Sequence, residues 1–230
     1  MIQNVGGKFL NNWLIPCKNG YVLIDTGFPR GYDAFLKRLT EKGIALSDIR
    51  YVVITHMHST RVGFLQKLLL TTEAVPIYNG EDRIRLESGK NNMNTYISRF
   101  DLLVANKIAS AFVERTQCFP AVFRENFLDA SKQPLLEEGI EFLTLSGHSE
   151  HDTCVLYDGK LFCGDVFSTG FFSSHRAPMW IYNKYKLLDE WREIEKLNVS
   201  EVYPATGKPF RGEEIPKAIE YWRARGVFRL

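Results

Sequence analysis

The sequence lacks several features that would place it in a special class of protein. It has only four cysteines in 230 residues, and their scattered positions give neither a disulfide framework nor a CxxC metal motif. No apolar run reaches the roughly 18 residues that a membrane span needs. The first residues show no basic segment followed by an apolar core, so we expect no secretion signal and a cytoplasmic location.

The chain also lacks an excess of charge of either sign. Its 29 basic and 27 acidic residues give a formal net charge of +2, which provides no general case for binding nucleic acid or a membrane surface. An apolar fraction of 45% and a charged fraction of 24% exclude a disordered chain. No linker divides the sequence, so we expect a single domain over residues 1–230.

Buried-strand patterns alternate with helical patterns along most of the chain, as is typical of an α/β domain. Strand patterns cover residues 9–16, 21–24, 49–55, 75–78, 140–145, 153–157, 160–164 and 199–203, and helical patterns cover residues 31–43, 62–70, 184–197 and 213–225. Asp158-Gly159 predicts a hairpin that places Cys154 opposite Cys163, and we expect both thiols to stay reduced in a cytoplasm.

Residues 91–131 interrupt this alternation. Their apolar residues have helical spacing, and no strand pattern accompanies them. We therefore predict an inserted helical segment within the domain.

Four side chains that can bind a metal come directly after strand patterns. They are His56, His58, His148 and Asp165. Strand ends at one sheet edge can converge, and three imidazoles beside a carboxylate suit a catalytic metal site with a position left open for water. Because neutral imidazole suits Zn²⁺ and Fe²⁺ alike, we predict a site for one divalent metal, zinc before iron.

Three further residues near these strand ends were weighed. His151 is close enough to His148 to be a spare ligand, whereas His175 lacks such a context and is interpreted as a loop residue. Asp25 ends a strand in Asp-Thr-Gly, and we interpret it as a turn residue whose carboxylate accepts nearby N–H groups. Orienting a metal-binding histidine is the alternative role for Asp25.

With these motifs the chain resembles the metallo-β-lactamase fold family over nearly its whole length. The matching segments are residues 22–27 (first motif), 55–63 (HxHxDH signature and following Gly), 146–149 (Gly-His-Thr/Ser), 163–165 (Gly-Asp) and 203–207 (Pro-Gly-His-Gly). The resemblance implies an α/β fold, a four-layer αββα sandwich with the active site at one edge of its two sheets. It also implies hydrolysis by a metal-bound hydroxide in most members, or iron-dependent sulfur oxidation and electron transfer in some.

Three residues depart from the family's pattern. The signature's Asp is Thr60, its last His is Arg61, and the His of the final motif is Thr206. In the family these positions and the bridging Asp form a second metal site, of which only Asp165 remains here. The resemblance therefore implies a divergent member that lacks the second metal site and keeps the three-histidine site.

Arg61 stands where the family has a metal ligand. A guanidinium carries a permanent positive charge and can hold a carboxylate through two parallel hydrogen bonds. We hypothesise that Arg61 pairs with Asp165 or reaches an anionic group of the substrate; a solvent-facing Arg is the alternative. Arg61 and Thr206 are our candidate substrate-binding residues. Since Thr60 cannot act as a base at neutral pH, Asp165 is the one matched carboxylate left for an acid–base role.

Insertions in this family resemble lids that wall the active site. Two aromatic groups, one in residues 91–131 and one in the loop after Asp165, are candidates for such a wall. A local core, or the face of a homodimer, is the interpretation that we favour for them.

Three functions follow from these patterns. The first is a metal-dependent hydrolase with a mononuclear site, acting on a small ester, thioester or lactone-like substrate. The second is a mononuclear non-haem iron oxidoreductase, in which His56, His148 and Asp165 would form a facial triad. The third is a catalytically degenerate binding or interaction module. We expect a small-molecule substrate and no nucleic-acid or membrane partner.

Overall fold

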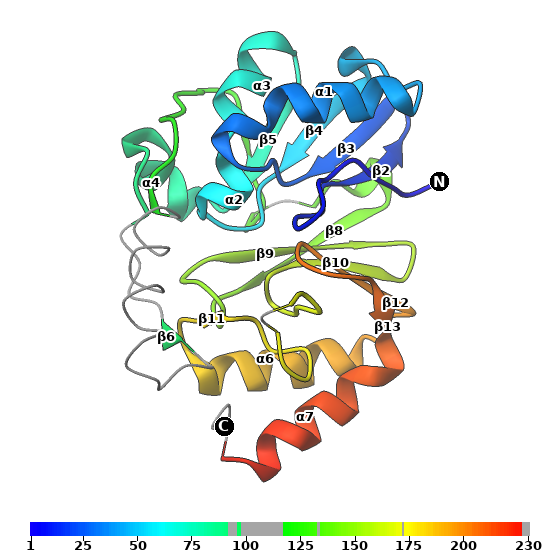
Figure 1. Ribbon diagram of the computed structural model, residues 1–230, viewed down its shortest axis with the longest axis vertical. Helices are drawn as coiled ribbons and strands as arrows, with labels where there is room; N and C mark the ends of the chain where they lie inside the picture. Colours follow the sequence, from blue (N-terminus) through cyan, green and yellow to red (C-terminus); the bar gives the residue numbers. More distant parts are fainter. Residues whose placement is uncertain (92–95, 98–116, 133, 172, 227–230) are drawn as a thin grey trace.

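Two β-sheets face each other in the computed structural model of the chain, and helices cover both outer faces (Figure 1). The structure describes residues 1–91, 96–97, 117–132, 134–171 and 173–226. The layers follow one another as helix, sheet, sheet and helix, which confirms the predicted four-layer α/β sandwich.

The first sheet is built by the N-terminal half of the chain. Its strands, in spatial order, are β1 (Gln3–Asn4), β2 (Trp13–Cys17), β3 (Gly20–Ile24), β4 (Ile49–Val53), β5 (Val75–Tyr78) and β7 (Leu128–Asp129). The pairs β1–β2 and β2–β3 are antiparallel, and the pairs from β3 to β7 are parallel. In the part of this half that the structure describes, the α-helices are α1 (Tyr32–Glu41), α2 (Ser59–Val62), α3 (Leu65–Thr71) and α4 (Arg83–Ser88).

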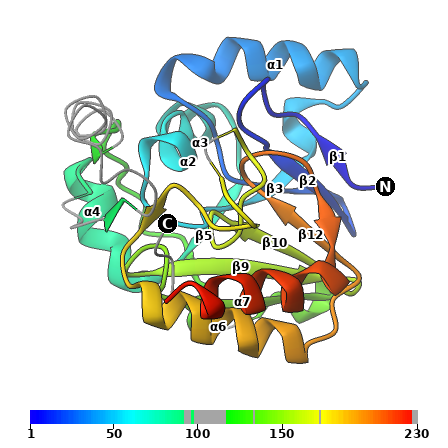
Figure 2. The same ribbon diagram turned by 60° about the horizontal axis from the view of Figure 1, so that its bottom comes forward.

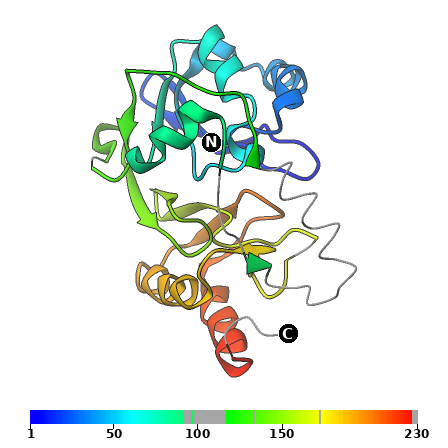
Figure 3. The same ribbon diagram turned by 90° about the vertical axis from the view of Figure 1, so that its left-hand side faces the viewer.

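The second sheet is built by the C-terminal half. Its spatial order is β13 (Phe210–Arg211), β12 (Glu201–Pro204), β10 (Lys160–Gly164), β9 (Asp152–Tyr157) and β8 (Ile140–Leu145). Helices α6 (Lys184–Lys196) and α7 (Ile215–Ala224) lie together on its outer face (Figure 2). A separate pair, β6 (Tyr96–Ile97) and β11 (Trp180–Ile181), lies beside this half (Figure 3).

Alternation along the strands explains the layers, because successive side chains of a strand point to opposite faces of its sheet. In β3, Leu23 packs toward the helices of the first half, while Val22 and Ile24 join the core between the sheets. In β10, Phe162 lies between the sheets and Leu161 lies against α6 and α7. Three apolar layers therefore hold four structural layers together.

Most predicted elements are present, and the differences have local causes. Strands 75–78 and 140–145 have the predicted bounds. The first predicted strand begins at Trp13 and not at residue 9, because the side-chain amides of Asn11 and Asn12 donate to the carbonyls of Pro204 and Asp25. The helix predicted for residues 62–70 is α3, which begins at Leu65, because Phe64 leaves helical geometry with φ of −109° and ψ of 15° and separates α3 from the short α2.

The inserted segment joins the sheet more closely than its helical spacing predicts. Its residues 92–95 and 98–116 lie outside the described residues. At its end, Leu128–Asp129 pairs with β5 as a parallel strand, so the expectation that the segment has no strand partner is wrong there. At its start, the amide of Asn91 donates to the carbonyl of Gln117 at 2.7 Å, which joins the two ends of the insertion.

Some of the aromatic residues that were candidates for a wall of the active site pack against other side chains, and others are exposed. Phe119 belongs to the first core, Phe127 stacks on Tyr78, and Phe167 stacks on Trp191. Phe123 and Phe171 are exposed. Among the described residues, no helix has the length and apolar character needed to cross a bilayer.

Candidate metal centre

The four predicted ligands meet where the ends of the two sheets face each other. His56 and His58 lie in the loop after β4, His148 in the loop after β8, and Asp165 directly after β10. One ligand atom of each lies within 4.8 Å of the others. The three histidines are buried, and Asp165 is partly buried.

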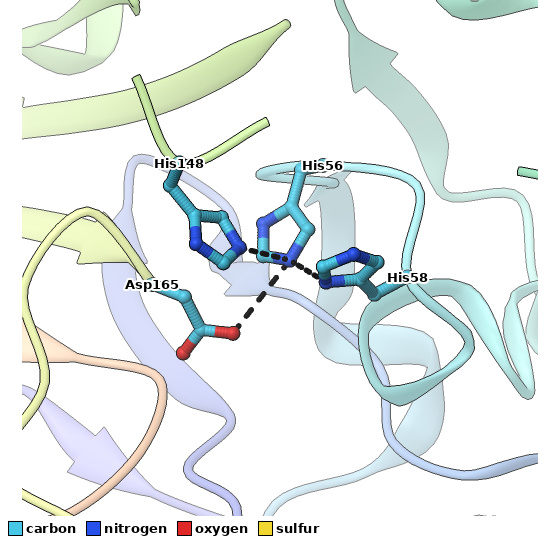
Figure 4. A group of neighbouring side chains, drawn as sticks. All are labelled: His56, His58, His148 and Asp165. Carbon is cyan, nitrogen blue, oxygen red and sulfur yellow. Dashed lines mark hydrogen bonds and ion pairs between the residues drawn. The ribbon is translucent and has the colours of Figure 1, made fainter. Parts of the chain in front are cut away.

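The imidazole rings of this group point their nitrogen atoms at one another (Figure 4). His56 Nε2 lies 2.8 Å from His58 Nδ1, 3.3 Å from His148 Nε2 and 3.6 Å from Asp165 Oδ2. Nitrogen ligands at Zn–N distances of about 2.0–2.1 Å in a tetrahedral site lie about 3.3 Å apart. The spacing therefore fits one metal ion among these atoms.

The outer hydrogen bonds of the rings show that the group suits a cation. His148 Nδ1 donates to the carbonyl of Trp180 at 2.8 Å. His56 Nδ1 lies 3.1 Å from Thr55 Oγ1, and because this hydroxyl donates its own proton to Asp25, it accepts from the ring. Both Nε2 atoms then carry lone pairs: that of His56 can accept from His58 Nδ1 at 2.8 Å, but it cannot bond the lone pair of His148 Nε2, which faces it at 3.3 Å. A metal ion between them satisfies both, so the residues present fit a divalent metal.

The protonation of the rings agrees with this. Burial, and then the neighbouring imidazoles and Arg61, hold the pKa of His56 well below its usual 6.5. Burial and His148 lower the pKa of His58 to about 3. Both rings are therefore neutral at neutral pH, which is the form that binds a metal.

The loop that carries His148 is held from several sides. Asp152 Oδ2 accepts from the backbone amides of His148 and Ser149, at 3.1 and 2.8 Å. Glu190 of α6 accepts from the amide of Ser146 at 2.7 Å. The segment after β11 adds bonds from the amide of Asn183 to the carbonyl of Gly147. His148 is thus fixed by both its backbone and its ring.

Arg61 lies in α2 and is 1% exposed. Its Nη2 donates to Asp165 Oδ2 at 2.8 Å and to Thr206 Oγ1 at 3.2 Å. Thr206 Oγ1 in turn donates to Asp165 Oδ1 at 3.1 Å. The predicted pairing of Arg61 with Asp165 is confirmed, and the predicted alternative of a solvent-facing arginine is wrong.

These contacts determine the charge of Asp165. Burial alone would raise the pKa of this carboxyl, but the charge of Arg61, the field of His148 and the Arg61 hydrogen bond outweigh burial and lower it. Asp165 is therefore a carboxylate at neutral pH, with hydrogen bonds to both of its oxygens.

Asp25 lies behind His56, in the left-handed region with φ of 58°. Its carboxylate accepts from the Thr55 amide at 2.8 Å and from Thr55 Oγ1, which also contacts His56 Nδ1. Arg61 Nε lies 3.9 Å from Asp25 Oδ2. Burial raises the pKa of Asp25 to about 7, against the opposing effects of Arg61 and Thr55. Asp25 can therefore serve in the turn and, through Thr55, also orient the ring of His56.

The remaining candidates lie outside the ligand group. His151 Nδ1 lies 3.1 Å from Asp82 Oδ1, and His175 stacks on Tyr221. Thr60 is buried in α2 beside Arg61. Cys154 and Cys163 are free, and Cys154 Sγ donates to the carbonyl of Cys163 at 3.7 Å.

Sequence reasoning missed several residues that support the ligands. Thr55 directly precedes His56, and a hydroxyl at the end of a buried strand could have indicated its role. Asp152 lies four residues after His148, and its carboxylate accepts from the backbone amides of His148 and Ser149. No local signal marks Glu190 or the Trp180 carbonyl, because both contacts join segments more than 30 residues apart.

A search of known protein families matches residues 5–206 to the Metallo-beta-lactamase superfamily. The match includes all four candidate ligands, and it ends at Thr206.

Solved structures of low sequence identity share the fold. A Cronobacter sakazakii metallo-beta-lactamase with a HARLDQ motif superposes with a TM-score of 0.69 at 15% identity, covering 98% of this chain and 89% of that one. BJP-1, a subclass B3 metallo-beta-lactamase of Bradyrhizobium japonicum, gives 0.68 at 16% identity, with 98% and 89% covered. An archaeal superfamily protein from Sulfolobus tokodaii gives 0.65 at 16% identity, with 93% and 80% covered.

Proposed function

The chain belongs to the metallo-beta-lactamase superfamily, and on this premise we propose that it is a metal-dependent hydrolase with a mononuclear site. The observation that carries the proposal is the convergence of three buried imidazoles, of which His56 and His148 bring their Nε2 atoms within 3.3 Å of each other. His56, His58 and His148 would hold the metal, with Asp165 beside them. The bound ion would polarise a carbonyl and lower the pKa of water toward about 7.

A single metal is proposed because Arg61 brings its own positive charge to the second position. Thr60 and Thr206 offer hydroxyls where the family has a carboxylate and an imidazole. The guanidinium is already bonded to Asp165, the one carboxylate that remains there. A second divalent ion at this place would have to displace the buried guanidinium of Arg61. The hydroxyls of Thr60 and Thr206 would be weak ligands for it.

The proposed substrate class follows from the groups that are present. An ester, thioester or lactone has a carbonyl that a metal ion can polarise and a leaving group that needs little help from a general acid. An amide needs a proton on its leaving nitrogen, and the loss of a positioned acid–base group typically costs about 10²–10⁴ in rate. Thr60 supplies no such group, and the hydrogen bonds and lowered pKa of Asp165 make it a weak base. These features favour substrates with good leaving groups.

Direct substrate contact by Arg61 is less favoured than contact by Thr206. Arg61 is 1% exposed, and its Nη2 atom is engaged by two partners. Thr206 is half-buried, so we propose that it faces the substrate while Arg61 acts through Asp165.

A mononuclear iron oxidoreductase is the second candidate. It is favoured by one observation, the approach of His148 Nε2 and Asp165 Oδ2 to the same nitrogen of His56, at 3.3 and 3.6 Å. Two imidazoles and one carboxylate on one side of an ion form the facial triad of non-haem iron enzymes.

The test is elemental analysis of protein purified without an affinity tag or added metal. We expect about one zinc per chain, lost in the His56→Ala and His148→Ala variants. The His151→Ala variant is the matched control, because His151 lies outside the ligand group and should keep the metal. The loaded protein should hydrolyse p-nitrophenyl acetate or a short acyl thioester, and this activity should fall with the metal content.

Two other outcomes would replace the proposal. One iron per chain with oxygen consumption on a thiol substrate would favour the oxidoreductase. No metal after reconstitution with zinc or ferrous iron would leave a binding module.

A further inference from the structure

Asp165 Oδ2 has two competing neighbours. On one side Arg61 Nη2 donates to it at 2.8 Å, and on the other His56 Nε2, the central nitrogen of the ligand group, lies 3.6 Å away. The same oxygen therefore bonds a guanidinium and belongs to the group that would hold the metal. The second oxygen is also engaged, by Thr206 Oγ1 at 3.1 Å.

The charge on Arg61 acts on the whole group. This side chain is buried, so its charge is poorly screened by solvent. Its Nη2 lies 2.8 Å from Asp165 Oδ2, which itself lies 3.6 Å from His56 Nε2. A fixed positive charge so close to the ligand group repels a divalent ion there. The hydrogen bond from Arg61 Nη2 also uses Asp165 Oδ2 as its acceptor, so it makes this oxygen a weaker metal ligand.

A weakly bound Asp165 matters because a tetrahedral zinc ion has only four ligand positions. Three histidines and a firmly bound carboxylate would fill all four positions of a tetrahedral zinc, which is the arrangement of closed structural sites. A catalytic site needs one position that an incoming ligand can take. A carboxylate that leaves the ion here does not become an unpaired buried charge, because Arg61 and Thr206 already hold it.

We propose that Arg61 keeps Asp165 as a weak, displaceable fourth ligand, so that one metal position opens to substrate while the three histidines retain the ion. This inference rests on the proposed function, since it requires a metal in the three-histidine site. Arg61 is then a positioning residue that sets how firmly Asp165 binds. In the opposite case, Arg61 would orient Asp165 toward the metal and strengthen its binding to the ion.

A double-mutant cycle on metal affinity separates these cases, because the two predict coupling of opposite sign. Zinc affinity is measured by chelator competition for the wild type, Asp165→Asn, Arg61→Met and the double variant. We expect Asp165→Asn to weaken zinc binding less than about 5-fold in the wild type and more than about 50-fold beside Arg61→Met. Arg192→Met, which removes an exposed arginine of α6, is the matched control and should change nothing.

The cobalt(II)-substituted proteins supply an independent readout. Azide is the probe for an exchangeable position, and it should bind the wild type and perturb its visible spectrum. It should bind Arg61→Met at least about 10-fold more weakly, because Asp165 then holds the position. The double variant should regain azide binding, which a mere loss of positive charge does not predict.

Several results would overturn the inference. The first is a loss of zinc affinity above about 50-fold in Asp165→Asn alone. This variant by itself tests the inference if Arg61→Met fails to fold. An equal or smaller loss in the Arg61→Met background would assign Arg61 the strengthening role. Wild-type protein that takes up no metal would overturn the proposed function together with the inference, whereas uptake with the wrong coupling would overturn the inference alone.

Discussion

Asp25 and Asp165 share one buried guanidinium. Arg61 contacts Asp165 at 2.8 Å and lies 3.9 Å from Asp25, and Thr26 fixes its position by donating to the Arg61 carbonyl at 2.7 Å. One cation cannot fully compensate two buried carboxylates. The pKa of Asp165 is lowered, and the pKa of Asp25 is raised to about 7 by burial. The two acids thus divide into one that is ionised and one that titrates near neutrality.

This division predicts a pH-dependent stability. Asp25 has a folded pKa of about 7 and an ordinary unfolded value of 3.8, so the unfolded state ionises first and stability falls as pH rises through about 7. In metal-free protein, the stability of Asp25→Asn relative to the wild type should therefore be higher at pH 8 than at pH 4.5, by no more than about 4 kcal/mol. Asparagine suits this left-handed position as well as aspartate does. Urea unfolding of both proteins at the two pH values measures the gain, and a difference that does not vary with pH would contradict it.

At the scale of elements, the His148 loop depends on its close packing against α6. A Cβ atom on Gly147 would lie 2.5 Å from Leu187 Cα and 2.5 Å from Glu190 Oε2, so the loop and helix cannot both stay in place. The amide next to this glycine is bonded to Glu190, and the carbonyl of Gly147 is bonded to Asn183. A shift of the loop would therefore move His148 out of the ligand group.

Gly147→Ala should consequently lose both stability and metal. We expect a loss of about 1–3 kcal/mol in the free energy of unfolding, the usual range for an overpacked site. Zinc affinity should fall by about 10-fold or more, measured by chelator competition. Gly7→Ala is the control, since a Cβ atom there meets nothing within 4 Å. Unchanged zinc affinity in Gly147→Ala would show that the loop tolerates the shift.

At the scale of the whole molecule, the candidate centre is divided between the two sheets. His56, His58 and Arg61 belong to the first half, and His148 and Asp165 belong to the second. The apolar layer between the sheets therefore sets the distance between the two sets of ligands. Phe162 is fully buried in this layer, where it stacks on Tyr203 and lies edge-on to Trp13.

Phe162→Ala should destabilise the protein by about 3–5 kcal/mol, the range for truncating a buried aromatic side chain. Because the cavity would lie between the sheets, zinc affinity should fall as well. Phe123→Ala makes the same chemical change at an exposed position, and it should cost less than about 0.5 kcal/mol. Thermal or urea unfolding of both variants tests the comparison, and equal losses would refute this role of the layer.

The sequence by itself determined the main strands and the candidate ligand set. A short apolar run identifies a buried strand locally, and His56, His58, His148 and Asp165 each follow such a strand, so their convergence could be predicted without knowing the sheets. The Arg61–Asp165 pair could be predicted as well, because a cation that replaces a metal ligand has an obvious partner in the bridging carboxylate.

Only the tertiary structure decided the rest. Strands of two residues, such as β7 and β11, have no period to detect, and they form because a neighbouring strand offers free hydrogen-bonding groups. The Trp180 carbonyl and Glu190 reach the His148 loop from segments 32 and 44 residues away. Arg61 and Asp165 are 104 residues apart, so the distance between them, and with it the charge of the centre, depends on how the two sheets pack.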